Sequence, residues 1–242
     1  MGEGMSLTVE ERKRVAEAWM TQIADTLRLK TVIVQVGAGN LKESVELARH
    51  AEEIGATAIA CMSPSYFKPT TEEVLVEYMA TVAAAAPTTP FYYYDINFMT
   101  GLYCDFNRLL TITRQTSCPS CPPLLSVFTM SASFTTSVSS QFLPALALGI
   151  DVPILNGFLG GIYRRLKEAF DDNDLQTARQ QQILARKLTQ LREKYGGGPA
   201  MVKGIMRCLG VNLGSVRLPL KDLSEEQVAS LGRDLQDLGL TE

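Results

Sequence analysis

The chain has 242 residues, of which 46% are hydrophobic and 20% charged, and its net charge at pH 7 is -3. These values are ordinary for a globular protein with a sizeable core. A mildly acidic chain without a basic cluster is a poor candidate for binding nucleic acid or a membrane surface. The sequence shows no phosphate-loop motif, no long unbroken apolar run and no signal peptide, so we expect a cytoplasmic protein.

The first hundred residues alternate between helical and strand patterns. Three helix starts are predicted, each with Thr or Asn followed three residues later by Glu: Thr8 and Glu11, Asn40 and Glu43, Thr70 and Glu73. Apolar and β-branched runs predict buried strands between these helices, over residues 31–36, 56–62 and 90–94. Such an order predicts parallel strands in a doubly wound sheet or in a (β/α)8 barrel. No G-x-G-x-x-G motif follows a strand, which favours the barrel.

The composition changes over residues 115–150, which contain no charged residue and are rich in Ser and Thr. This segment sustains neither the helical nor the strand period, so we treat it as an atypical part of the domain. Helical patterns return afterwards over residues 164–170, 175–195 and 200–208, with a turn at 196–199. We predict one partial barrel domain over residues 1–222. Residues 223–242 would add a C-terminal helix to the same domain, capped by Ser224 and Gln227.

The five cysteines suggest reduced thiols, because their number is odd and no secretory signal accompanies them. Cys118 and Cys121 form a C-x-x-C motif, which is compatible with a redox pair or with half of a zinc site. Zinc would need two further ligands, and the only histidine, His50, lies within a helical pattern. A redox pair would open a helix, whereas Pro122 and Pro123 follow at once. We therefore expect no metal site.

The aromatic segment at residues 91–96, which contains most of the third predicted strand, is the strongest candidate for a functional element. Side chains alternate along a strand, so Tyr92 and Tyr94 should share one face while Phe91 and Tyr93 share the other. Tyr94 ends the strand, and the carboxyl ends of barrel strands carry the active site. Taken alone, the pattern is compatible with a core strand or with a strand that delivers a catalytic phenol.

Several segments resemble the N-acetylneuraminate lyases, which belong to the same superfamily as the dihydrodipicolinate synthases. The likeness covers about residues 1–110 and 164–222 and is weak over 111–163. It is carried by a Gly-Glu-Gly-x-Ser-Leu segment, the aromatic strand and several shorter matches: residues 2–8, 36–38, 67–69, 91–96, 100–101, 198–206 and 217–220.

The resemblance implies a (β/α)8 barrel, a homotetramer and the reversible aldol cleavage of N-acetylneuraminate to N-acetylmannosamine and pyruvate. It implies no metal and no diffusible cofactor. A lysine of such enzymes forms a Schiff base with the ketone of the substrate, and the imine accepts the electrons of the breaking bond. Tyr94 corresponds to the tyrosine that transfers the proton. Gly2 and Glu3 correspond to the end of a Gly-Thr-Thr-Gly-Glu loop that binds the substrate carboxylate.

The sequence departs from this family at three places. Met1 stands where the second threonine is expected, so we expect the first strands of the barrel to be missing. No lysine occurs between Lys68 and Lys167, the interval in which the imine lysine is expected, so none is identifiable. The family's Gly-x-Asp-Glu segment corresponds to residues 137–140, which carry no carboxylate.

Two functional hypotheses follow from these departures. The chain is a lyase that cleaves N-acetylneuraminate, or it is a catalytically inactive family member or splice form that acts as a binding or assembly subunit. A truncated or misassembled gene product would also account for the charge-free segment. Lys203 lies in a helical pattern and is expected to be structural or at the surface, and Lys68 corresponds to a non-catalytic loop.

Overall fold

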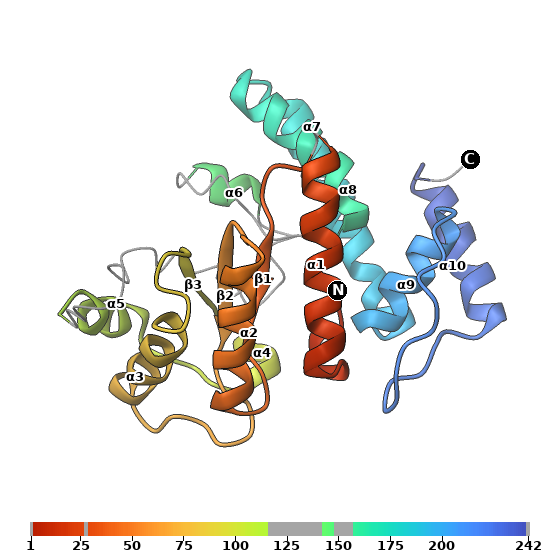
Figure 1. Ribbon diagram of the computed structural model, residues 1–242. Coiled ribbons are helices and arrows are strands. Elements are labelled where there is room, and N and C mark those ends of the chain that lie inside the picture. Colours follow the sequence, from red (N-terminus) through yellow and green to blue (C-terminus); the bar gives the residue numbers. More distant parts are fainter. Residues whose placement is uncertain (1, 27–28, 116–141, 148–156, 241–242) are drawn as a thin grey trace. The chain divides into compact units, whose positions relative to one another are not determined.

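The computed structural model describes residues 2–26, 29–115, 142–147 and 157–240. The chain divides into two compact units (Figure 1). The strand unit is Leu7–Ser133, and the helical unit combines Met1–Ser6 with Phe134–Glu242. Each unit has a hydrophobic core of its own. No helix within the described residues has the length and apolarity that a bilayer crossing requires.

The strand unit contains a parallel sheet in the order β1-β2-β3. Its strands are β1 (Ile33–Gln35), β2 (Ala58–Met62) and β3 (Phe91–Tyr94). The helices of this unit are α1 (Val9–Asp25), α2 (Leu41–Glu53), α3 (Glu72–Ala83), α4 (Asn97–Thr100) and α5 (Phe106–Gln115). The predicted alternation of helices and parallel strands is therefore confirmed. Neighbouring strands follow one another in sequence order, as consecutive strands of a barrel do.

Local side-chain hydrogen bonds start the helices largely where the sequence predicts. The Thr8–Glu11 and Ser224–Gln227 capping boxes are both complete, and Asn40 accepts a hydrogen bond from the backbone of Glu43. The prediction at Thr70 is wrong by one residue, because Thr71 caps α3 by accepting from the Val74 N–H. Glu73, expected to close that capping box, instead forms an ion pair of 2.7 Å with Arg108 of α5.

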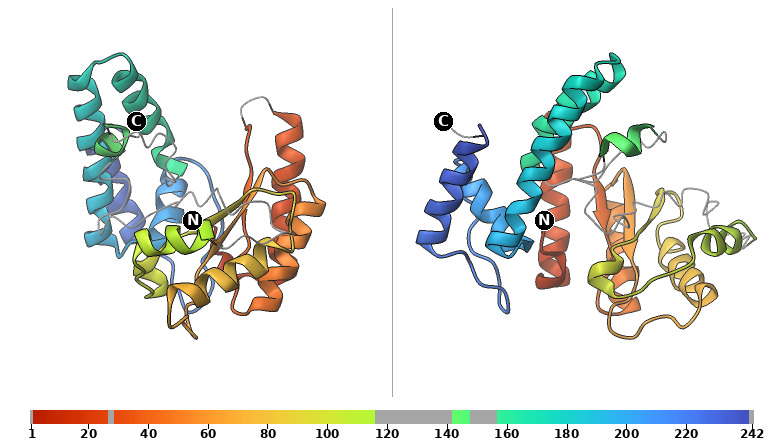
Figure 2. Two further views of the ribbon diagram at one scale, coloured as in Figure 1. Left: turned by 90° about the vertical axis from the view of Figure 1, so that its left-hand side faces the viewer. Right: turned by 180° about the vertical axis from the view of Figure 1, so that it is seen from behind.

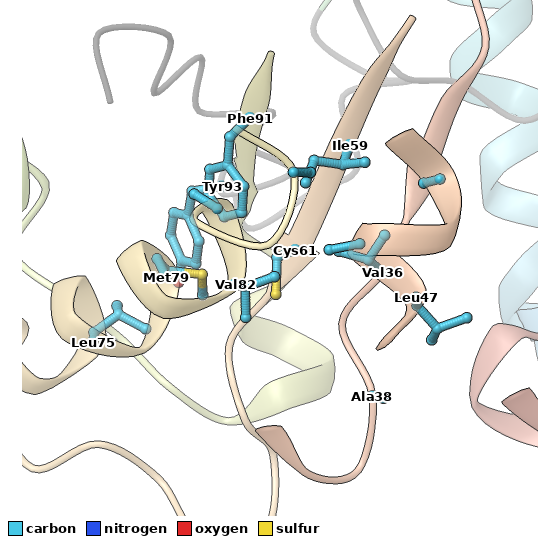
Figure 3. Packing of buried hydrophobic residues seen from close by; sticks show 14 of the residues in the cluster. Val36, Ala38, Leu47, Ile59, Cys61, Leu75, Met79, Val82, Phe91 and Tyr93 are labelled. Atoms are coloured by element: carbon cyan, nitrogen blue, oxygen red, sulfur yellow. The ribbon is translucent and has the colours of Figure 1, made fainter. Parts of the chain in front are cut away.

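The core of the strand unit lies between the sheet and its helices (Figure 3). Cys61 of β2 and Tyr93 of β3 point from the sheet towards this core, where they meet side chains of α3 such as Met79 and Val82. Each fully buried apolar side chain of this kind stabilises the fold by roughly 1.5–3 kcal/mol. Ile59 and Phe91 belong to the same core, and because side chains alternate, the residues between these four face the opposite side of the sheet.

The helical unit is built from α-helices that pack around a second core (Figure 2). In the described residues its elements are η1 (Gly4–Ser6), α6 (Phe142–Ala147), η4 (Gly157–Leu159), α7 (Gly160–Asp171), α8 (Leu175–Tyr195), α9 (Gly198–Cys208) and α10 (Glu225–Asp237). The predicted helix over 175–195 matches α8, and α10 adds Leu231 and Leu235 to the core.

The turn before α9 is shorter than predicted: Gly196, Gly197 and Gly198 all have positive φ, but α9 already begins at Gly198. Pro199 lies in the first turn of α9, where proline is tolerated because the N–H that it lacks would have no partner within the helix. Of the charge-free segment, residues 142–147 form α6 and the rest, apart from Gln115 at the end of α5, lies outside the described residues. The single domain over 1–222 stays a prediction.

Candidate active site

Tyr94 ends β3 at the carboxyl edge of the sheet, in register with Met62 at the end of β2. Both residues alternate with core residues, so they belong to the sheet face opposite the core that α2 and α3 help to form. Within the described part of the chain, the Tyr94 hydroxyl has no hydrogen-bond partner. Burial raises the pKa of Tyr94, so the phenol is protonated at neutral pH. The described residues thus place a protonated phenol at the carboxyl edge of the sheet.

Tyr93 has a different environment, although it is the adjacent residue. It is 2% exposed, and its hydroxyl lies 3.8 Å from the sulfur of Cys104. Burial raises the pKa of Tyr93, and the neighbouring Cys104 and Asp95 raise it further. The interpretation as a core strand thus holds for Phe91 and Tyr93, and a catalytic role for Tyr94 stays a prediction.

The carboxyl end of β1 packs closely against the end of β2. A Cβ atom on Gly37 would lie 2.8 Å from the side-chain nitrogen of Gln35 and 2.9 Å from the backbone nitrogen of Met62. Arg12 of α1 donates hydrogen bonds of 2.7 Å to both the backbone and the side-chain oxygen of Gln35. Burial lowers the pKa of Arg12. The sequence did not predict the contact between Arg12 and Gln35, since no pattern links residues so far apart.

Lys68 lies on the loop that follows β2, and its side chain is exposed. Its Nζ atom lies 3.6 Å from the position that a Cβ on Gly101 would occupy. Gly101 ends α4 with a φ of +65°, a conformation that favours glycine. Because β2 and β3 are parallel, the loops after both strands lie at the same edge of the sheet. Lys68 therefore places an amino group at the carboxyl edge of the sheet, the edge at which Tyr94 also lies.

An apolar cavity lies on the other side of the sheet, between α3 and α5. Its lining is Leu75, Val76, Met79, Phe91, Tyr93, Leu109 and Thr113. These side chains offer few hydrogen-bonding groups for a polyhydroxylated acid, and Tyr94 is not among them. The cavity is thus part of the helix-covered core, separate from the candidate site.

Gly2 and Glu3, the predicted carboxylate-binding residues, belong to the helical unit. Gly2 is exposed, whereas the Glu3 side chain is only 8% exposed and pairs with Lys203 at 2.7 Å. The ammonium group of Lys203 is held between this carboxylate and the backbone oxygen of Ser215. Substrate contact by Gly2 and Glu3 stays a prediction.

The other predicted residues have structural roles or lie outside the described residues. His50 of α2 contacts the Glu17 carboxylate of α1 at 2.8 Å, as a half-buried helix residue would. No group of three or more His, Cys, Asp or Glu side chains in the described ranges could hold a metal ion. The predictions for Cys118, Cys121 and residues 137–140 fall outside the described residues.

Comparisons with known proteins agree with this geometry. Residues 1–121 match the model of the dihydrodipicolinate synthetase family. The chain is 38% identical to the N-acetylneuraminate lyase of Gallus gallus over 98% of this chain and 82% of that protein. It is 37% identical to the N-acetylneuraminate lyase of Homo sapiens over 98% of this chain and 78% of that protein.

Solved structures give the same result for the fold. The N-acetylneuraminate lyase from Aliivibrio salmonicida superposes with a TM-score of 0.84 at 28% identity, covering 100% of this chain and 83% of that structure. The Proteus mirabilis N-acetylneuraminate lyase superposes with a TM-score of 0.83 at 30% identity, covering 99% of this chain and 84% of that structure. The sheet and helices of the strand unit are therefore those of a (β/α)8 barrel protein, as predicted. The chain belongs to the dihydrodipicolinate synthetase family.

Proposed function

We propose that this chain is a carbon–carbon lyase of the sialic acid aldolase type, cleaving N-acetylneuraminate reversibly to N-acetylmannosamine and pyruvate. The observation that carries the proposal is the similarity to N-acetylneuraminate lyases along 98% of the chain. As the resemblance implies, the proposed form is a cytoplasmic homotetramer that uses neither a metal nor a diffusible cofactor.

Tyr94 is the proposed proton-transfer residue. Its phenol stands at the carboxyl edge of the sheet, where barrel enzymes carry their active sites, and it makes no hydrogen bond to another described residue. The raised pKa keeps the phenol protonated until the reaction, and the corresponding phenolate is a strong base. In the condensation direction the protonated phenol would donate its proton to the newly formed alkoxide, and in the cleavage direction the phenolate would accept the proton of the alcohol.

Schiff-base formation requires an amine, and the sequence has none between Lys68 and Lys167. This absence favours a second function, in which the chain is a catalytically inactive subunit that binds ligand or assembles with other copies. An arginine cannot replace the lysine, because a guanidinium remains protonated and is a poor nucleophile. Lys68 is the described amine to examine first, since it lies at the edge that carries Tyr94.

Trapping with borohydride decides between the two functions. The folded chain is incubated with pyruvate and sodium borohydride, and the intact mass and peptide map are recorded. A reduced pyruvyl adduct on a lysine supports the aldolase, and its loss in Lys68→Met but not in Lys42→Met would assign the amine. A folded chain without any adduct refutes the covalent route. Co-migration with a full-length N-acetylneuraminate lyase in size-exclusion chromatography would then support the assembly subunit.

Tyr94→Phe tests the proton-transfer role separately. Removal of a general acid–base group typically slows turnover by about 10²–10⁴-fold, and imine formation with pyruvate should persist. Tyr92→Phe is the matched control, because it removes the same hydroxyl from the same strand and the same face of the sheet. Equal rates of N-acetylneuraminate cleavage in the two variants would contradict the assignment of Tyr94.

A further inference from the structure

The backbone of Glu3 is held in a conformation that a residue with a side chain rarely adopts. Its φ is +49°, in the left-handed region. Such conformations persist only where the surrounding structure determines them, and they concentrate at functional sites. The carbonyl of Glu3 accepts a 2.7 Å hydrogen bond from the Ser6 N–H, which closes the turn at the start of η1. The conformation at Glu3 sets the direction of the preceding peptide, which joins it to Gly2.

The Glu3 side chain is anchored to a part of the chain two hundred residues away. Its carboxylate is 8% exposed and pairs with the ammonium group of Lys203 at 2.7 Å, and Lys203 is itself 19% exposed. Lys203 also donates a 2.7 Å hydrogen bond to the carbonyl of Ser215. Because the pair is largely buried, removing either partner should be destabilising: the remaining charge would be desolvated and unpaired.

A second anchor lies beside the first. The backbone N–H of Arg217 approaches the other carboxylate oxygen of Glu3 at 3.4 Å, and its guanidinium donates a 3.1 Å hydrogen bond to the carbonyl of Ser6. These bonds connect both ends of the short segment 3–6 to α9 and to the loop that follows it. All of these residues belong to the helical unit. The segment is thus held through the Glu3 side chain and through the backbone carbonyl of Ser6.

We propose that Lys203 is a positioning residue for the substrate carboxylate, acting through Glu3 on the orientation of the peptide between Gly2 and Glu3. This inference rests on the proposed function, in which Gly2 and Glu3 end the loop that binds the carboxylate of a 2-oxo acid. Lys203 does not touch the substrate in this scheme. Its ammonium group holds the Glu3 carboxylate, and the strained backbone at Glu3 then presents the loop in one orientation.

Three variants of the full chain test the proposal. Lys203→Gln removes the charge, and Lys203→Arg keeps it. Lys194→Gln is the matched control, because Lys194 forms a 2.8 Å ion pair with Asp234 in the same unit but is 53% exposed. The first readout is amide hydrogen exchange over residues 2–6. The second is the dissociation constant of pyruvate by calorimetric titration, and urea unfolding confirms that each variant is folded.

The expected result for Lys203→Gln is faster exchange over residues 2–6 and a pyruvate dissociation constant raised about tenfold, because small misplacements of binding groups are costly. Lys203→Arg should recover most of the affinity, and Lys194→Gln should match the wild type in both readouts. Faster exchange with unchanged pyruvate affinity would reduce Lys203 to a structural residue and overturn the proposal. A wild-type chain that binds no pyruvate would overturn the proposed function as well, so the two failures are distinguishable.

Discussion

Cys61 makes the stability of the strand unit depend on alkaline pH. The thiol lies in β2 with no exposed surface, and burial raises its pKa from the ordinary 9.0 to about 12, with a partial offset from Arg12. Below pH 9 the thiol is neutral in both the folded and the unfolded chain, so its contribution is fully present. Between pH 9 and about 12 only the unfolded chain loses the proton, which stabilises the unfolded state and lowers the free energy of unfolding.

The magnitude follows from the pKa difference. Each pH unit between the two pKa values costs about 1.4 kcal/mol, so the loss at about pH 10.5 is about 2 kcal/mol. Urea denaturation of the wild type and Cys61→Ala, under reducing conditions between about pH 8 and 10.5, measures this contribution. The small cavity in the variant lowers its free energy of unfolding by the same amount at every pH. As the pH rises, the variant should lose less stability than the wild type. Two parallel curves would refute the reasoning, because tyrosines and other groups titrate equally in both proteins.

Three substitutions test packing and capping, each measured by urea denaturation. Gly37→Ala should lower the free energy of unfolding by about 1–3 kcal/mol through overpacking, whereas Gly39→Ala meets no atom within 4 Å and should not; equal effects would contradict the tight packing. Thr8→Ala removes a capping box and should cost about 1 kcal/mol. Leu188→Ala, at 1% exposure, should cost about 2–5 kcal/mol, and a similar loss in the exposed Lys187→Ala would argue against core packing.

Local patterns predicted much of the secondary structure. The boundaries of α8 were predicted to the residue, and the capping boxes that start α1 and α10 are present as expected. These features depend on side chains within three or four positions of each other, so the linear sequence contains the information that they need. At α3 the prediction is wrong by one residue: Thr71 caps the helix, and Glu73, which the pattern had assigned to the cap, forms an ion pair with Arg108 of another helix.

The sequence by itself determined that three parallel strands alternate with helices and that a tyrosine ends the third strand. It also implied the family, through matches such as the aromatic strand. Only the tertiary structure distinguished Tyr93, which is buried against Cys104, from Tyr94, whose hydroxyl makes no hydrogen bond to another described residue. Only it paired Glu3 with Lys203. The physical reason is distance along the chain: burial and charge pairing depend on residues that folding brings together, and their spacing in sequence leaves no repeating pattern.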